Sequence, residues 1–325
     1  MPISDRAAPR PAVVLVDGAG GRELAVVRDL MGSLQMPVLL LTDTDFGAAR
    51  VSFDLSRRAL IVGERRVRPA VVWTRHAGAA TIAARASGRR SGVEAASWAG
   101  LVHQLTASAD HRLPGRAPVG TVQLLDARRL GVRTPRTIVT TDVAGAARLL
   151  GSRRIVVKTP DFRISEPDRR KWPAHLPAIV DRNDLSGGDT EGPRVVQEYV
   201  PHARELRVYH LNGGICAFEV HKHEPATVWT DPGAVEVSQV RCPAAVAAVV
   251  RTLSVAWGLR YGAFDLLLTH GGEPVFLEVN TDGDWLWYER RAGWHGVSFM
   301  AAVMVRELFT HGPSKGVRRS ELIAG

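Results

Sequence analysis

Residues 261–289 read YGAFDLLLTHGGEPVFLEVNTDGDWLWYE, and they contain two strand-like runs on either side of a Gly-Gly pair. Each run places one carboxylate among apolar residues, Asp265 in AFDLLL and Glu278 in VFLEVN. A two-residue turn at Gly271 and Gly272 would join the two runs as a β-hairpin. In that register the two acids lie directly opposite each other.

The two facing acids need a counter-charge. Like charges opposite each other destabilise a sheet, and burying them unpaired costs several kcal/mol for each ion. A bound cation removes this conflict. The same register puts Ala263 opposite Asn280, which projects to the same face as Glu278 because the two are two residues apart. Three oxygen ligands on one face, with positions left for water and phosphate, suit Mg²⁺ better than zinc. The alternative is that these are exposed polar positions on an edge hairpin.

Length and composition indicate a soluble protein of roughly two to three domains. The chain has 325 residues, of which 45% are hydrophobic and 23% charged. No apolar run is long enough for a membrane span, and the N-terminal residues lack a secretory apolar core. Two cysteines, Cys216 and Cys242, are too few for a disulfide framework. We therefore expect a cytoplasmic protein with reduced thiols.

The charge balance favours an acidic partner. The formal net charge is +9, and only four of the 42 basic residues are lysines. No block of five like charges and no known nucleic-acid-binding module is visible. An acidic peptide or nucleotide phosphates are therefore favoured over nucleic acid.

The order of apolar runs predicts three parts. Strand-like runs alternate with a helical segment in residues 1–115, which predicts an α/β domain with a parallel sheet. Residues 116–198 form a second part, in which helix and strand patterns alternate before a polar segment at 161–193. We predict a mobile loop or small insertion for that segment, with a lid as one possible role. Residues 199–325 hold further strands, the hairpin and a closing helix.

Three polar sites before the hairpin also interrupt apolar strands. Lys158 ends the run RRIVVK, where it could reach a nucleotide phosphate, although a solvated strand end is the alternative. Gln197 and Glu198 end the strand RVVQE, and the chain that follows could bind an adenine edge through its backbone. Glu205 and Arg207 lie in the next run, where Arg207 could hold a phosphate or acyl phosphate. For each of these two residues taken singly, a cross-strand ion pair with a neighbouring strand is equally compatible with the sequence.

Taken in this order, the motifs resemble those of ATP-grasp ligases over residues 118–310. The segment FDLLL…GGEPVFLEVN is the specific part of this resemblance, and FLEVNTDGDWLWYE is similar to the tail of the graspetide (microviridin-type) synthetases. VVWTRH, which contains Arg75, and GVRTPRTIVTTD also resemble segments of that branch. The resemblance implies an α/β (α+β) ATP-grasp fold preceded by an α/β pre-ATP-grasp domain.

The resemblance also implies roles for individual residues. ATP and Mg²⁺ would be the cofactors, with Asp265, Glu278 and Asn280 as metal ligands. Lys158 would hold phosphates, Glu205 the ribose, and Arg207 the reacting phosphate or tetrahedral intermediate, so that Lys158 and Arg207 are the catalytic candidates. The nucleotide base would lie against residues Gln197, Glu198, Tyr199 and Val200. Candidate substrate contacts are Arg75, His221, Lys222 and Asp284.

Two positions depart from the family pattern. The usual Asn-Lys pair at the start of the central part is Val119-Gly120 here, and Arg116 or an arginine between residues 128 and 136 is the candidate substitute. Asp284 stands where the family usually has Gln. His221 and His223 have no third ligand at a suitable spacing, which favours a polar strand face over a zinc site.

The implied reaction is the ATP-dependent joining of a carboxylate to an amine or hydroxyl through an acyl phosphate. A macrocyclase acting on an acidic precursor peptide is the favoured form. The alternatives are a ligase that adds a free amino acid and a degenerate nucleotide-binding regulator. The sequence does not give the peptide, the bond type, the ring number or the oligomeric state, for which a homodimer is one candidate.

Overall fold

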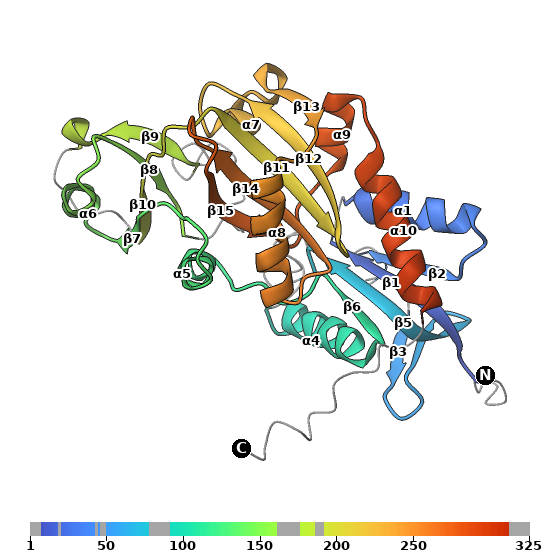
Figure 1. Cartoon of the computed structure of the whole chain (residues 1–325). Coiled ribbons are helices and arrows are strands. Elements are labelled where there is room, and N and C mark those ends of the chain that lie inside the picture. The colour runs from blue at the N-terminus through green and yellow to red at the C-terminus, as the bar shows by residue number, and fades with distance from the viewer. Residues whose placement is uncertain are drawn as a thin grey trace, which may run out of the picture. The chain divides into compact units, whose positions relative to one another are not determined.

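A computed structural model of the chain describes residues 8–18, 21–42, 45, 50–77, 92–160, 176–185 and 192–311 (Figure 1). Its contacts divide the chain into two units, one of Met1–Pro114 with Ser298–Gly325 and the other of Gly115–Val297. The first boundary lies one residue before the expected one. The closing helix α10 (Gly296–Thr310) differs from the expectation, because from Ser298 onward it groups with the N-terminal unit. An apolar helix pattern predicts a buried face but does not say against which part of the chain it packs.

The N-terminal unit contains a mixed sheet with the strand order β2-β1-β5-β4-β3, and a further strand, β6, pairs with β5. The parallel strands are β1 (Arg10–Asp17), β2 (Val38–Thr42), β5 (Arg65–Arg75) and β6 (His111–Leu113). Helices α1 (Glu23–Ser33) and α4 (Gly92–Ser108) also belong to this unit. The predicted parallel α/β core is therefore present. The sequence analysis missed the antiparallel strands β3 (Val51–Asp54) and β4 (Ala59–Val62).

In the second unit, the first sheet is antiparallel and has the order β7-β10-β8-β9. Its strands are β7 (Thr137–Thr140), β8 (Arg154–Lys158), β9 (Ala178–Asp181) and β10 (Arg194–Glu198). The helices are α5 (Val122–Arg129), α6 (Val143–Leu150) and the short η2 (Arg182–Asp184). Asp142 caps α6 by accepting a hydrogen bond from the Gly145 N–H at 2.8 Å, as its position before the helix suggests.

The polar segment 161–193 is more ordered than we expected where it is described. Residues 178–181 form β9, which pairs with β8, because the run AIVD provides apolar residues between polar neighbours. Residues 161–175 and 186–191 lie outside the described part of the chain, and so does most of the expected lid.

The second sheet of this unit is antiparallel, with the order β13-β12-β11-β14-β15. Its strands are β11 (Arg204–Leu211), β12 (Gly214–His221), β13 (Glu236–Val240), β14 (Tyr261–Leu268) and β15 (Pro274–Asn280). The helical segments are α7 (Thr227–Thr230), η3 (Pro232–Ala234), α8 (Ala244–Ala256) and α9 (Leu286–Ala292). None of the described helices combines the length and apolar character needed to cross a bilayer.

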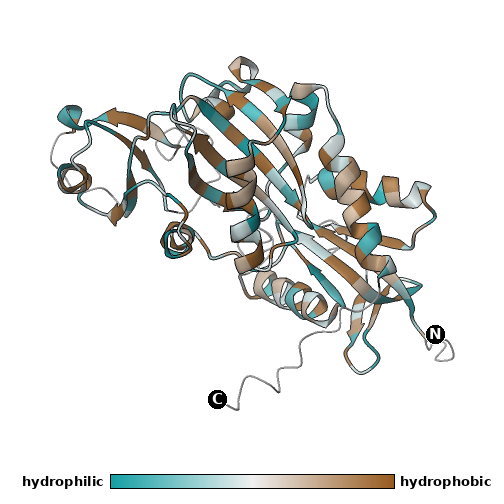
Figure 2. Ribbon diagram, viewed as in Figure 1, coloured by the Kyte–Doolittle hydropathy of each residue, from teal (hydrophilic) through white to brown (hydrophobic). Residues whose placement is uncertain are grey.

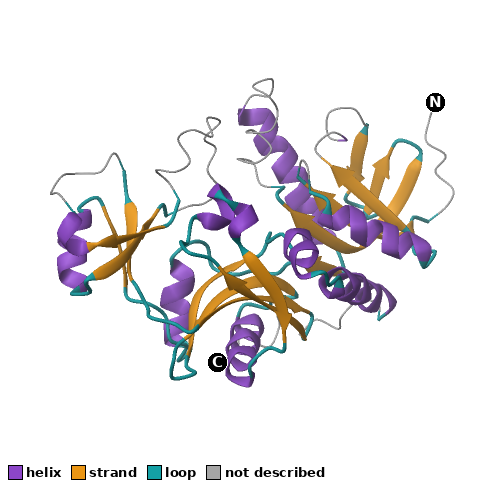
Figure 3. Cartoon of the chain, turned by 90° about the horizontal axis from the view of Figure 1, so that it is seen from above, coloured by secondary structure: helices purple, strands orange, loops and turns teal. Residues whose placement is uncertain are grey.

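The two faces of this sheet have different roles. Helix α8 covers one face, where Val208 and Phe264 join Leu253 of the helix in a fully buried core (Figures 1 and 3). Side chains alternate along a strand, so Arg207 and Asp265 point to the opposite face. The alternation of hydrophobic and hydrophilic residues along these strands is visible in Figure 2. Because one face of the sheet is buried against α8, the residues between the buried ones have their side chains on the opposite face.

The β14–β15 hairpin has the expected pairing at Asp265 and Ala263, but its turn differs from the predicted one. Asp265 pairs with Glu278, and Ala263 with Asn280, as predicted. The predicted two-residue turn is wrong, because β14 ends at Leu268 and pairs there with Pro274, leaving residues 269–273 as the loop. This longer loop shifts the register by one residue, and a bulge between Asp265 and Leu266 shifts it back.

A buried histidine makes the stability of this unit sensitive to pH. His210 on β11 is 5% exposed, and its Nε2 accepts a hydrogen bond from the Gly213 N–H at 3.0 Å. Burial, with a smaller effect of Arg251, lowers the pKa of His210 from 6.5 to about 4. Between these values the unfolded chain binds a proton that the folded chain does not, so stability falls as the pH falls.

We expect acidification from pH 7 to pH 4 to remove up to about 3 kcal/mol of unfolding free energy through His210. Urea unfolding at both pH values would measure this effect. The variant His210→Gln should lose this part of the pH dependence, because Gln keeps an acceptor but cannot titrate. His270→Gln, at an exposed loop position, is the matched control. Equal pH dependence in wild type and His210→Gln would contradict the assignment.

Candidate active site

A cavity of about 620 Å³ lies in the second unit and receives side chains from both of its sheets. Strands β8, β9 and β10 contribute from one sheet, and β11, β12, β14 and β15 from the other, with α7 and α9 adding further walls. Twelve of the fourteen residues singled out from the sequence line this cavity: Lys158, Gln197, Glu198, Tyr199, Val200, Glu205, Arg207, Lys222, Asp265, Glu278, Asn280 and Asp284.

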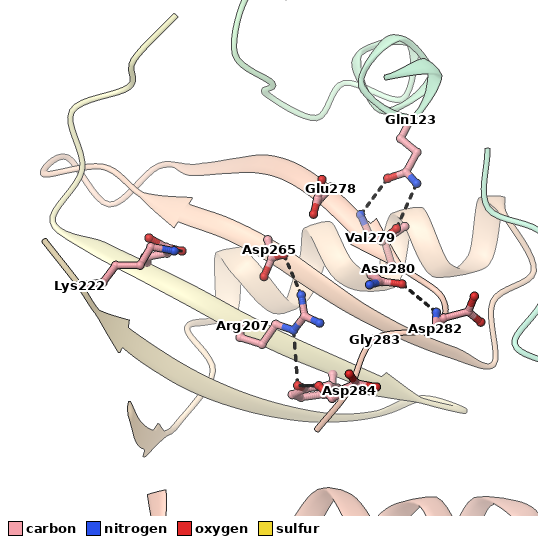
Figure 4. Close-up of polar contacts among 12 residues, drawn as sticks. Gln123, Arg207, Lys222, Asp265, Glu278, Val279, Asn280, Asp282, Gly283 and Asp284 are labelled. Atoms are coloured by element: carbon pink, nitrogen blue, oxygen red, sulfur yellow. Dashed lines mark hydrogen bonds and ion pairs between the residues drawn. The ribbon is translucent and has the colours of Figure 1, made fainter. Parts of the chain in front are cut away.

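Three oxygen donors lie together on the cavity face of the hairpin (Figure 4). They are partly solvated and not buried as we expected, since the side chains of Asp265 and Glu278 are 25% and 40% exposed. Asn280 Oδ1 accepts a hydrogen bond from the Asp282 N–H at 2.9 Å, and a carbonyl oxygen retains a second lone pair for a ligand. Two carboxylates and an amide oxygen fit Mg²⁺. In the described part of the chain, no cluster of three His, Cys, Asp or Glu side chains offers an alternative metal site.

Cationic side chains surround these donors. Lys158 Nζ lies 3.9 Å from Glu278 Oε2, and its side chain is only 13% exposed, which disfavours the alternative of a solvated strand end. Lys222, the residue directly after β12, donates from its Nζ to Glu205 Oε1 on β11. Glu205 therefore pairs with Lys222, and Arg207 pairs across the sheet with Asp265 of β14, so the ion pairs that we considered for these two residues are formed.

Arg207 is held on several sides. Its Nη1 donates to Asp265 Oδ2 at 2.7 Å, and its guanidinium lies over the rings of Tyr209 and Tyr288 at 5.5 and 5.4 Å. Burial lowers the pKa of Arg207, but the Asp265 carboxylate and the two tyrosines outweigh this effect and raise it well above the ordinary value. The guanidinium is thus a permanent positive charge in a fixed orientation, with further N–H donors beyond those used by Asp265 and Tyr209.

Three backbone groups are occupied at the end of β10 and in the linker that follows it. The Glu198 N–H donates to Arg136 O at 2.9 Å, and the Tyr199 N–H donates to Arg154 O at 3.2 Å. Val200 O lies 2.8 Å from His202 Nδ1. The Val200 N–H, among the described residues, makes no such bond. It is therefore the N–H of residues 198–200 that could bind a base edge.

The comparison with solved structures gives matches over nearly the whole chain. The ATP-grasp ligase PsnB, complexed with a phosphomimetic variant of its minimal precursor, Mg and ADP, has a TM-score of 0.72 and 16% identity, covering 92% of this chain and 99% of PsnB. The chain has an ATP-grasp fold. The macrocyclase MdnC from Microcystis aeruginosa MRC, bound with precursor peptide MdnA, has a TM-score of 0.67 and 18% identity, covering 91% of this chain and 99% of MdnC.

D-alanyl-alanine synthetase A from Vibrio cholerae O1 also matches, with a TM-score of 0.52 and 14% identity over 94% of this chain and all of the synthetase. Comparison of the sequence with models of protein families gave no match, and neither did comparison with curated proteins.

Two of the expected substrate contacts, Arg75 and His221, are not among the residues that line this cavity. Arg75 is completely buried in the N-terminal unit, where its Nη1 lies 3.6 Å from Asp17 Oδ2 and 3.4 Å from Glu23 Oε2. A side chain with no exposed surface is better explained as part of a structural ion-pair cluster. His221 is on the opposite face of β12 from Val220, beside Glu219, because side chains alternate along the strand.

The expected substitute for the missing phosphate-binding lysine is not found among the described arginines. Val119 and Gly120 line a second cavity of about 190 Å³ next to Lys158. None of the five candidates lines either cavity: Arg116, Arg129, Arg128, Arg133 and Arg136. The last three are engaged elsewhere, with Thr134 and Pro135, with Glu273, and with Leu149 and Leu150, respectively. Among the described lysines, Lys158 is the one that lines both cavities.

Gln123 was missed by the sequence analysis. From α5 its Oε1 accepts from the Val279 N–H at 2.8 Å, and its Nε2 donates to Val279 O at 3.0 Å (Figure 4). Val279 lies between Glu278 and Asn280, so Gln123 holds the backbone that carries two of the proposed metal ligands. A glutamine on an amphipathic helix gives no sequence signal for this contact, which depends on the tertiary structure.

Replacing Gln123 with Leu should lower the unfolding free energy by about 2–4 kcal/mol, because it leaves both polar groups of Val279 buried without partners. It should also weaken Mg²⁺ binding. Urea unfolding and metal titration would measure the two effects. Gln239→Leu, at an exposed position of β13, should change neither. If Gln123→Leu were as stable as the wild type, the two bonds to Val279 would contribute little to the unfolding free energy.

Proposed function

We propose that the chain is an ATP-dependent ligase that joins a carboxylate to an amine or hydroxyl on a peptide. The observation that carries the proposal is the grouping of Asp265, Glu278 and Asn280 with Lys158 and Arg207 around one cavity of an ATP-grasp fold. Such a site activates a substrate carboxylate as an acyl phosphate, and the acceptor then displaces phosphate. The reaction yields ADP and needs no covalent enzyme nucleophile.

Different residues of the cavity would bind the base, the phosphates and the metal ion. The Val200 N–H and the apolar side chains of Ile179, Leu267 and Leu277 provide a place for the base. Lys158 neutralises phosphate charge, and Asp265, Glu278 and Asn280 would hold Mg²⁺. Bound Mg²⁺ would supply charge neutralisation on the phosphates. Arg207 stabilises the charge that develops on the reacting phosphate or on the tetrahedral carbon's oxygen.

A peptide substrate is supported by two observations. The PsnB and MdnC structures contain precursor peptides. The net charge of +9 on the present chain suits an acidic peptide. We therefore place the protein in peptide maturation of the graspetide type. Its cytoplasmic location and a homodimeric state stay predictions.

A free amino acid is the second candidate for the acceptor, favoured by the likeness to the D-alanyl-alanine synthetase. Purified protein, Mg-ATP and the peptide encoded beside the gene would test both forms. Cyclisation lowers the peptide mass by one water per bond, whereas ligation adds an amino acid residue. ATP binding without phosphate release for any acidic peptide or amino acid would instead support a nucleotide-binding regulator, which the missing Asn-Lys pair at Val119-Gly120 favours.

A further inference from the structure

The turn that follows β15 lies directly against Arg207. A Cβ atom added to Gly283 would lie 2.6 Å from Arg207 Nη2 and 2.5 Å from Ala263 Cβ. Both distances are far shorter than normal contacts, so only glycine allows the turn to approach this closely. Figure 4 shows Gly283 and Asp284 beside the Arg207 guanidinium. The position of residues 281–284 therefore limits where this side chain can lie.

Two buried tyrosines hold this turn through consecutive carbonyl groups. The Tyr261 hydroxyl donates to Gly283 O, and the Tyr209 hydroxyl donates to Asp284 O. Both tyrosines are completely buried, so these bonds form away from competing solvent. The rings are packed in turn, Tyr261 against Trp285 at 5.7 Å and Tyr209 against Phe218 at 5.9 Å.

Tyr209 also contacts Arg207 itself. Arg207 Nε lies 3.4 Å from the Tyr209 hydroxyl oxygen, which can accept this bond while it donates its own proton to Asp284 O. The guanidinium and the turn therefore share one phenol group. Burial raises the pKa of Tyr209 well above its ordinary value, despite the opposing effect of Arg207, so the hydroxyl keeps the proton that it donates.

We propose that Tyr209, Tyr261 and Gly283 are positioning residues that hold the turn 281–284 and orient Arg207 toward the reacting phosphate or acyl carbon. The proposal rests on the proposed function, in which Arg207 contacts the reacting group. A displacement of about 1 Å in such a group can cost roughly a hundredfold in rate. The turn also carries Asp284, which lines the cavity at the same end.

The test compares Tyr209→Phe, Tyr261→Phe and Gly283→Ala with wild type in steady-state phosphate release with the peptide encoded beside the gene. Tyr209→Phe and Gly283→Ala should lower kcat roughly a hundredfold and change KM for ATP less than about threefold. Tyr261→Phe should give a smaller fall, because it loses the bond to the turn but leaves Tyr209 in contact with Arg207. The matched glycine control is Gly271→Ala in the hairpin loop, where an added Cβ meets only Thr269 Oγ1 at 3.9 Å.

Hydrogen exchange gives a second readout that needs no substrate. Amides of residues 281–288 should exchange faster in Tyr209→Phe and Tyr261→Phe than in wild type or Gly271→Ala. Unchanged exchange and unchanged kcat in Tyr209→Phe would overturn the positioning role. The positioning role would also be overturned if every variant, including Gly271→Ala, lost activity in proportion to its fall in melting temperature. Such a result would indicate that these residues only contribute to packing.

The two proposals fail in different ways. If wild type releases no phosphate with any peptide or amino acid, the proposed function is overturned, and exchange still decides whether the tyrosines hold the turn. If wild type is active and the tyrosine variants retain its kcat, the positioning role is overturned while the proposed function stands. Because Tyr→Phe removes only a hydroxyl, a failure of Gly283→Ala to fold would leave this comparison intact.

Discussion

Replacing Glu278 with Gln should lower phosphate release roughly a thousandfold at ordinary Mg²⁺ concentration. The amide keeps the shape of the side chain but removes one of two proposed carboxylate ligands, and metal coordination contributes several kcal/mol to such reactions. The substitution also removes the charge pair between Lys158 Nζ and Glu278 Oε2, which lie 3.9 Å apart. Higher Mg²⁺ should partly restore activity, because the defect is in metal affinity. Phosphate release over a range of Mg²⁺ concentrations is the measurement.

Glu273→Gln is the matched control for this prediction. Glu273 lies in the loop of the same hairpin, pairs with Arg133 and does not line the cavity. The Glu273→Gln variant should release phosphate at the wild-type rate. A Glu278→Gln enzyme with wild-type activity and an unchanged Mg²⁺ requirement would remove Glu278 from the metal site.

The sequence predicted the part of the site that depends on strand periodicity. Glu278 and Asn280 share a face because side chains alternate along a strand, and Asp265 shares it because the register places it opposite Glu278. The pairing of Asp265 with Glu278 was nevertheless obtained with the wrong turn, since the bulge beside Asp265 compensates for the longer loop. A bulge gives almost no signal in a hydrophobic pattern. The predicted register was correct because the missed bulge and the loop predicted too short shift the pairing in opposite directions.

The sequence could not predict the partners of these residues. Asp265 pairs with Arg207, and Glu205 with Lys222, because β11 lies beside both β14 and β12. Strand order is a long-range property that local patterns do not determine. The same limit explains Arg75: a basic residue at a strand end suggests a ligand contact, yet it is fully buried beside acids from β1 and α1. Buried ion pairs and binding residues look alike in a sequence.

Arg207→Lys should reduce the rate of phosphate release roughly a hundredfold or more while leaving ATP binding nearly unchanged. Lysine keeps the positive charge, so the loss tests the geometry of the guanidinium and not its charge alone. A lysine ammonium at this position cannot contact Asp265 and Tyr209 simultaneously while directing further donors into the cavity. Removal of one oriented donor to a developing oxyanion costs about a hundredfold to a thousandfold in rate.

Arg204→Lys provides the comparison on the same strand. Arg204 points to the opposite face of β11 and pairs with Glu219 at 2.7 Å, outside the cavity. Its replacement should preserve the rate, because neither its charge nor its geometry reaches the reacting groups. If Arg207→Lys keeps the wild-type kcat, Arg207 acts only as the counter-charge of Asp265. An Asp265→Asn, Arg207→Met double variant should then be as stable as wild type, because both charges of the ion pair are removed together and neither is left unpaired.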